Sequence, residues 1–183
     1  GFKVAMGSLA MCAFYEALLE RDLSQVDLAA VAAARQPWAE IEADIRGRFD
    51  GALAEVKGKY TEAFMTAACP GIVCTTLGNK YYDSHEAYVR AVAREMQKEY
   101  ELIHQRGYVL QLDCPDLAME RHGQWQHASL KEFQDAITIH IDAINQACVN
   151  IPADRIRLHV CWGNYDGPHD CDVPLADIFP IIS

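Results

Sequence analysis

From residue 62 onward, short apolar segments alternate with longer segments of helical periodicity, and this alternation limits the possible folds more than any other feature of the chain. Residues 62–76 predict a strand, a turn at Pro70-Gly71 and a second extended piece. Residues 108–113 and 155–162 predict two further strands. Strands separated by single helices form parallel sheets through right-handed crossovers. The sequence therefore predicts an α/β fold.

The first helix between these strands is predicted from its ends and its periodicity. Asp83 and Glu86 are the expected N-terminal capping pair, and Gly107 is the expected stop. The apolar residues that recur at helical spacing, and are expected to face the core, are Tyr88, Val92, Met96, Tyr100 and Ile103.

A capping box predicts the start of the second helix. Ser129 and Glu132 form this box, and the helix is expected to end near Asn150. A short third helix is expected from about Pro174. The residues expected to face the core from the second helix are Leu130, Phe133, Ile137, Ile141, Ile144 and Cys148.

The region before residue 59 differs from the rest. We expect two parts, a mainly helical region over residues 1–58 and an α/β part over residues 59–183, which is either an open sheet or part of a barrel. The inward residues expected in the helical region are Trp38, Ile41, Ile45, Phe49, Leu53 and Val56.

Charge and cysteine content exclude several classes of protein. The net charge of −10 would repel a phosphate backbone, so nucleic acid is not an expected partner. No uncharged apolar stretch of about 18 residues is present, so no membrane span is expected. The chain has 7 cysteines, an odd number without C-x-x-C pairs, which favours a reducing, cytoplasmic environment over a disulfide framework.

Candidate site residues follow two of the predicted strands, where α/β proteins bind ligands. His159 and Cys161 are two residues apart on one strand, so their side chains are expected on the same side, and both are zinc-type ligands. A buried His and Cys that face the barrel interior are the structural alternative. His169 and Cys171 are the nearest candidates for further ligands, although their spacing is not diagnostic.

Asp113 ends an apolar strand, where a carboxylate is costly unless it is paired or binds a cationic group. Its functional interpretation is substrate binding. The alternatives are a cap for the following loop or a salt bridge to Arg121.

Four stretches together resemble the cobalamin-independent methionine synthase family, in particular its shorter single-barrel members, which include the epoxyalkane:coenzyme M transferases. They are AACPG (67–71), YYDSHEAYVRAVAREMQKEYELI (81–103), LQLDCPDLAMERH (110–122) and RLHVCWGNYDGPHDCDVPLADI (157–178). The resemblance covers about two thirds of the chain, from about residue 62 to residue 183.

The resemblance implies a (β/α)8 TIM barrel and a zinc-dependent methyltransferase of methionine biosynthesis. The family's H-x-C zinc ligands match His159 and Cys161, and its substrate-binding aspartate matches Asp113. Zn2+ would hold a thiol such as homocysteine as the thiolate, which attacks the methyl group of 5-methyltetrahydrofolate. Asp113 would hold the ammonium group of an amino-acid substrate.

Two departures from the family bear on what this chain does by itself. The family's remaining zinc ligands, a glutamate and a second cysteine on later strands, are expected beyond Ser183, and residues 1–50 match the family's opening strands poorly. Because a closed barrel needs about 250 residues, we expect only part of the barrel here.

Two alternative functions remain open from the sequence. The first is an epoxide-opening thiol transferase of the coenzyme M type, for which Arg121 is a candidate sulfonate partner. The second is a truncated, non-catalytic barrel fragment. Unpaired sheet edges would be covered either in a homodimer or by a helical cap from about residues 8–58.

Overall fold

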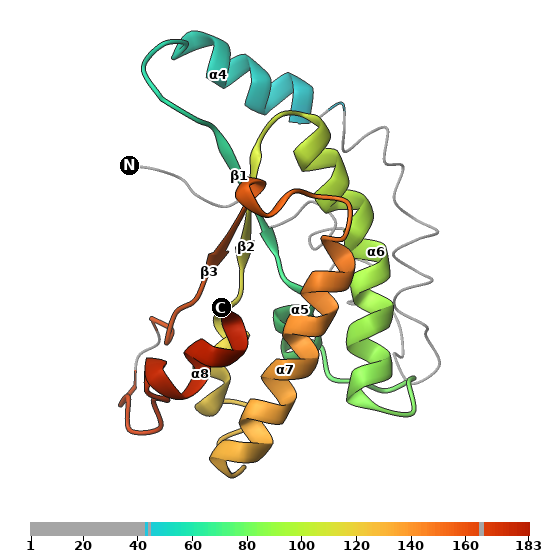
Figure 1. Cartoon of the computed structure of the whole chain (residues 1–183), viewed down its shortest axis with the longest axis vertical. Coiled ribbons are helices and arrows are strands. Elements are labelled where there is room, and N and C mark those ends of the chain that lie inside the picture. The colour runs from blue at the N-terminus through green and yellow to red at the C-terminus, as the bar shows by residue number, and fades with distance from the viewer. Residues whose placement is uncertain (1–42, 44, 165–166) are drawn as a thin grey trace.

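The core of the chain is a parallel sheet of three strands. The computed structural model describes residue 43, residues 45–164 and residues 167–183. Within these residues the strands are β1 (Phe64–Ala68), β2 (Val109–Asp113) and β3 (Ile156–His159), in the order β1-β2-β3 (Figure 1). The predicted parallel α/β sheet is confirmed. The described residues do not close this sheet into a barrel.

The strands are paired so that their carboxyl ends lie at one level. Ala68 is paired with Asp113, which in turn is paired with His159. The backbone N–H of Cys114 continues this pattern by donating to the carbonyl of His159, at 2.9 Å. The register therefore places the last residue of every strand at the same edge of the sheet.

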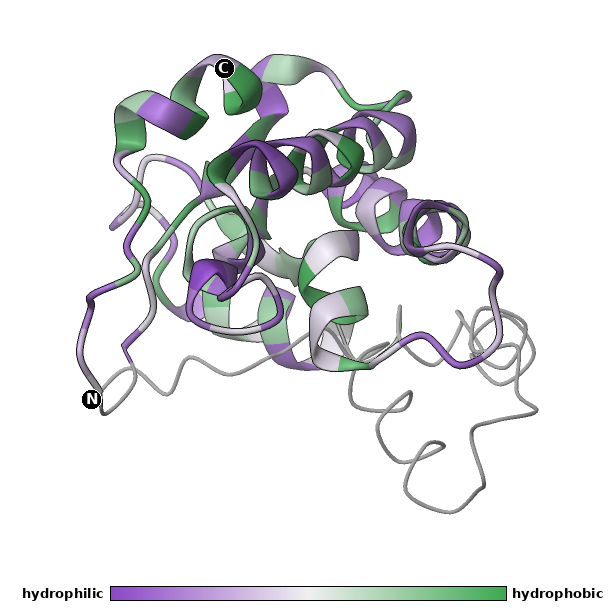
Figure 2. Cartoon of the chain, turned by 90° about the horizontal axis from the view of Figure 1, so that it is seen from below, coloured by the Kyte–Doolittle hydropathy of each residue, from purple (hydrophilic) through white to green (hydrophobic). Residues whose placement is uncertain are grey.

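Two long helices cover one side of the sheet. They are α6 (His85–Gln105) and α7 (Leu130–Ala147), which pack against each other beside the shorter helix α5 (Pro70–Thr76) (Figure 1). Figure 2 shows hydrophobic and hydrophilic residues alternating around the ribbons of the long helices, as expected for helices that are buried on one side.

Helix α6 matches its predicted core face but begins one residue later than predicted. Ser84, and not Asp83, is the N-cap, because its hydroxyl accepts from the N–H of Ala87 at 3.1 Å. Gly107, with φ of 83°, follows the end of the helix as predicted. All five residues predicted to face the core are buried, namely Tyr88, Val92, Met96, Tyr100 and Ile103.

Helix α7 begins with the predicted capping box. The Ser129 hydroxyl accepts from the N–H of Glu132, and the Glu132 carboxylate accepts from the N–H of Ser129. Phe133, Ile137, Ile144 and Cys148 are buried as predicted. The prediction for Leu130 was wrong, since its side chain is 39% exposed at the first helical position, before the helix reaches the core.

The prediction of a second extended piece after Pro70-Gly71 was wrong, because these residues begin helix α5. Cys69 is its N-cap, and its sulfur accepts from the N–H of Ile72 at 3.4 Å. Pro70 occupies a position where its missing N–H costs nothing. The β-branched residues of α5 favour a strand locally, but packing against α6 and α7 outweighs that preference.

Strand β3 is shorter than predicted. Its four residues follow a short 3-10 turn, η5 (Ala153–Arg155), and end at His159, so Cys161 and Trp162 lie in the following loop. Two further 3-10 turns, η3 (Pro115–Leu117) and η4 (Met119–Arg121), follow β2. Helix α8 (Leu175–Ile182) begins after Pro174, as predicted.

Residues just before β1 also contact the core. They form a π-helical segment, η2 (Ile45–Asp50), and helix α4 (Gly51–Glu55). Phe49 and Leu53 pack against the core, and the Phe49 ring meets the ring of Tyr108 edge-on at 5.0 Å. The prediction that Val56 faces inward was wrong, because it is 39% exposed.

Trp38 and Ile41, which were also predicted to face inward, lie outside the described residues. The same holds for the side chain of Ile45. The division at residue 58 stays a prediction. Among the helices of the described residues, none combines the length and apolar character that crossing a bilayer requires.

Candidate functional site

Asp113 and His159 lie next to each other at the carboxyl edge of the sheet. They end the neighbouring strands β2 and β3, and His159 Nε2 is 3.7 Å from Asp113 Oδ1. Their side chains are 48% and 49% exposed, so a small molecule can reach both. An imidazole and a carboxylate at this distance can bind a cationic group together or share a bound ion.

The same face of the sheet carries further polar side chains. By the alternation of strands, Thr66, Gln111 and Arg157 share a face with Asp113 and His159. Gln111 Nε2 donates to the Thr66 hydroxyl at 3.4 Å. Helices α5, α6 and α7 lie on the opposite side (Figure 1). This polar face is accessible, because Arg157 and His159 are exposed and the other three are partly so.

Cys161 lies beyond the end of β3, although the H-x-C spacing predicts that it shares the strand with His159. Strand β3 ends at His159, so the two-residue period that would align the two side chains no longer applies at Cys161. The Cys161 thiol is free and only partly buried, which leaves it accessible to an ion or a reagent. Its role as a zinc ligand together with His159 stays a prediction.

The alternative salt bridge from Arg121 to Asp113 is not formed by Nη1 of Arg121. Its Nη1 donates to the carbonyls of Trp125 and Ala128, at 2.9 and 2.8 Å. The guanidinium also lies over the ring of Phe133, 5.6 Å from its centre. Arg121 therefore fastens the loop before α7.

His169 and Cys171 are grouped with a different histidine. The ligand atoms of His122, His169 and Asp172 lie within 4.8 Å of one another, and so do those of His122, Asp170 and Cys171. These groups form around the loop between β3 and α8 and include neither His159 nor Cys161.

Behind the sheet, on the helix side, four side chains form a hydrogen-bonded chain. The Cys69 thiol donates to Asp116 Oδ1 at 2.8 Å, and His140 Nδ1 lies 2.7 Å from Asp116 Oδ2. His140 Nε2 is in turn 2.8 Å from His85 Nε2. Asp116 and His140 are fully buried, so each depends on these partners in place of water.

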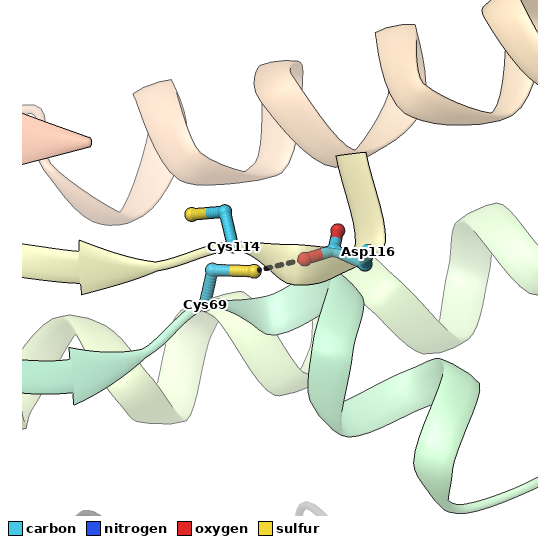
Figure 3. A group of neighbouring side chains, drawn as sticks. All are labelled: Cys69, Cys114 and Asp116. Carbon is cyan, nitrogen blue, oxygen red and sulfur yellow. Dashed lines mark hydrogen bonds between the residues drawn. The ribbon is translucent and has the colours of Figure 1, made fainter. Parts of the chain in front are cut away.

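Figure 3 shows the thiol of Cys69 directed at Asp116, and the thiol of Cys114 directed away from it. The ligand atoms of these three residues lie within 4.8 Å of one another, close enough to hold a metal ion if the thiols turned and lost their protons. Burial raises the pKa of both thiols, which keeps them protonated at neutral pH when no metal is bound.

His85, the last residue of this series of hydrogen bonds, is an uncharged histidine. Burial, and secondly the neighbouring His140, lower the pKa of His85 to about 4. The neutral imidazole can donate from Nε2 to His140, whose other nitrogen then donates to Asp116. The arrangement stabilises a buried carboxylate next to the end of β2.

The buried partners of Asp116 were not predicted, although the sequence contains a usable signal. His140 occupies the apolar face of α7, three residues after Ile137 and four before Ile144. A polar residue within such a face needs a partner in the core. Asp116 was a natural candidate, since it follows the predicted strand at 108–113 by three residues.

Gly71 leaves the space in which Asp116 and His140 form their contact. A Cβ at this position would lie 2.0 Å from Asp116 Oδ2 and 2.4 Å from His140 Nδ1. Gly71→Ala should therefore lower the free energy of unfolding by roughly 1–3 kcal/mol, the usual range for overpacking. Urea denaturation measures this change.

Gly78→Ala is the matched control for Gly71→Ala, because a Cβ at Gly78 meets no atom within 4 Å. Equal stabilities of the two variants would contradict the described packing of Asp116 and His140.

The cysteines are expected to differ in reactivity. Cys161 and Cys171 are partly exposed, whereas Cys69 and Cys114 are fully buried and have raised thiol pKa values. The native chain should therefore be alkylated at Cys161 and Cys171, whereas Cys69 and Cys114 should be alkylated only after unfolding. Iodoacetamide labelling, resolved by peptide mass spectrometry, measures this order. Rapid native labelling of Cys69 or Cys114 would contradict the described core.

Three curated proteins, each named methionine synthase, are similar to part of the chain. They come from Thermococcus kodakarensis, Pyrococcus horikoshii and Pyrococcus abyssi and are 32%, 31% and 32% identical to it over 88 residues. The match covers 48% of this chain and only 22% of each relative. No family model and no solved structure matches the chain. The matches support a distant relationship to methionine synthases.

Proposed function

We propose that this chain carries part of a zinc-dependent site for methyl or alkyl transfer to a thiol, of the cobalamin-independent methionine synthase type. The observation that carries the proposal is the pairing of Asp113 with His159 at the carboxyl ends of neighbouring parallel strands. These are the residues that match the family's substrate-binding aspartate and first zinc ligand. The distant similarity to archaeal methionine synthases supports the same assignment.

In this proposal the three strands form an arc of a (β/α)8 barrel. A barrel has its helices outside and its strands inside, and its active site lies at the carboxyl ends of the strands. The described sheet agrees with that plan, because α6 and α7 cover one face and the other face bears Asp113, His159 and Arg157. The polar face corresponds to the barrel interior.

The residues at this edge fit a zinc ion by their chemistry. His159 offers an imidazole nitrogen and Cys161 a sulfur, both of which are common zinc ligands, and both residues are accessible. Bound Zn2+ would lower the pKa of a substrate thiol, so that the thiol reacts as a thiolate at neutral pH. His159 and Cys161 would hold the ion, together with ligands that the family supplies from later strands.

Asp113 has the role of orienting the substrate. Its half-exposed carboxylate can accept hydrogen bonds from the ammonium group of homocysteine or a related amino-acid thiol. Because His159 lies 3.7 Å away, an amino acid held by Asp113 would have its thiol side chain near the proposed metal ligand. The donor expected from the resemblance is 5-methyltetrahydrofolate, whose methyl group would move to the thiol sulfur.

Arg157 supports a second candidate function, the opening of an epoxide by a sulfonated thiol. This residue precedes His159 by two positions on β3, so both project from the same face. Its guanidinium lies over the ring of Phe64, 4.4 Å from the ring centre, and the residue remains exposed. Arg157 thus replaces Arg121 as the candidate partner for a sulfonate.

The proposal predicts that homocysteine increases zinc binding by the chain. Bound zinc would be measured by equilibrium dialysis and elemental analysis, with and without homocysteine. The thiol-dependent increase should be lost in the double variant His159→Ala/Cys161→Ser. It should be reduced in Asp113→Asn, because this variant keeps the metal ligands but weakens the contact to the ammonium group.

Asp154→Asn is the control for charge, since Asp154 is exposed in the turn before β3. The same titration with 2-mercaptoethanesulfonate in place of homocysteine tests the second function. In that case the thiol-dependent increase in bound zinc should depend on Arg157 and not on Asp113. An increase that persists in the His159→Ala/Cys161→Ser variant would overturn the proposed zinc site.

A further inference from the structure

A second cluster of metal-type ligands lies between the turn η4 and the loop that joins β3 to α8. His122 directly follows η4, and its side chain is only 9% exposed. Its Nε2 lies 2.7 Å from Asp172 Oδ1, and His169 Nδ1 lies 3.0 Å from the same oxygen. Two imidazole nitrogens are therefore directed at one carboxylate oxygen.

Further ligand atoms surround the same histidine. Asp170 and Cys171 place their ligand atoms within 4.8 Å of each other and of His122, just as His169 and Asp172 do. Four consecutive residues of the loop thus offer an imidazole, two carboxylates and a thiol around His122.

The loop is held in place at its base. Trp162 Nε1 donates to the carbonyl of Val173 at 2.7 Å, which joins the two ends of the loop. The rings of His122 and His169 are 5.5 Å apart and nearly perpendicular, at 71°. The ligand atoms therefore converge in the folded chain without any rearrangement of the sheet.

The donor types select the class of ion. Imidazole nitrogen favours zinc and related transition-metal ions, whereas Mg2+ and Ca2+ prefer sites made only of oxygen atoms. Separations of 2.7 and 3.0 Å between nitrogen and oxygen need to widen only slightly to admit an ion with bonds of about 2.0–2.2 Å. An aspartate is ionised at neutral pH, as a metal ligand must be.

We propose that His122, His169 and Asp172 bind one divalent transition-metal ion of the zinc class. The site uses none of the residues proposed for methyl transfer, and it does not depend on that function. Bound metal would fasten the loop after β3 to the turn η4, next to the edge of the sheet that bears His159.

The test is a titration of the whole chain with Zn2+ in the absence of any thiol substrate, followed by calorimetry and elemental analysis. The wild-type chain and the His159→Ala/Cys161→Ser variant should both bind one equivalent at this site. His122→Ala and His169→Ala should each weaken binding by at least about tenfold, since the loss of a residue that only hydrogen-bonds to a metal ligand already costs about 10- to 100-fold in metal affinity.

His127→Ala is the matched control, because His127 is an exposed histidine close to His122 in sequence, and this variant should bind like the wild type. Circular dichroism would check that each variant is folded, and Asp172→Asn, which preserves side-chain size, provides a second variant. Equal zinc affinity in the wild type, His122→Ala and Asp172→Asn would overturn the proposal.

Titration with Co2+ distinguishes this ligand set from the neighbouring group of His122, Asp170 and Cys171. A thiolate ligand produces a charge-transfer absorption band in the near ultraviolet. The wild type should show no such band that depends on Cys171. A band that disappears in Cys171→Ser would place the ion on Cys171 and overturn the proposed ligand set.

Discussion

The in-register pairing of three parallel strands is the constraint on which the rest of the structure depends. It places Ala68, Asp113 and His159 at one level, and the next residue of each strand, such as Cys69 or Cys114, just beyond it. Since successive side chains point to opposite faces, one register generates two different chemical environments. Asp113 and His159 face the accessible side, whereas the two cysteines are buried toward the helices. A shift by one residue in β2 or β3 would exchange these environments and turn Asp113 or Arg157 toward the core.

The buried side is stabilised by polar contacts as well as by apolar packing. Asp116 is fully buried directly behind the carboxyl edge, where it accepts from the Cys69 thiol and pairs with His140. An unpaired carboxylate at such a position would be costly, so these contacts hold the end of β1, the turn after β2 and helix α7 in one arrangement. Gly71 permits the close approach. The network thereby supports the edge of the sheet from which Asp113 and His159 reach solvent.

Local signals in the sequence were sufficient for the elements but not for their tertiary contacts. The capping box of Ser129, the stop at Gly107 and the apolar periodicity of the long helices predicted α6 and α7 to within a few residues at each end, because these signals act within one helix. Helix α5 was missed, since its β-branched residues favour a strand until tertiary packing decides. The adjacency of Asp113 and His159 followed from parallel topology. The end of β3 before Cys161 depends on tertiary contacts that no local pattern encodes. The position of His140 on an apolar helix face indicates that it needs a buried partner, but does not by itself identify both Asp116 and His85.

The most direct test of the strand register is a nuclear magnetic resonance measurement of scalar couplings across hydrogen bonds in the isotope-labelled chain. The structure predicts a coupling between the amide nitrogen of Cys114 and the carbonyl carbon of His159, and another between the amide nitrogen of Cys69 and the carbonyl carbon of Asp113. Observation of both would establish that the strand ends lie at one level. Coupling of the Cys114 amide to the carbonyl of Leu158 or Val160 would contradict the register, and with it the joint site of Asp113 and His159.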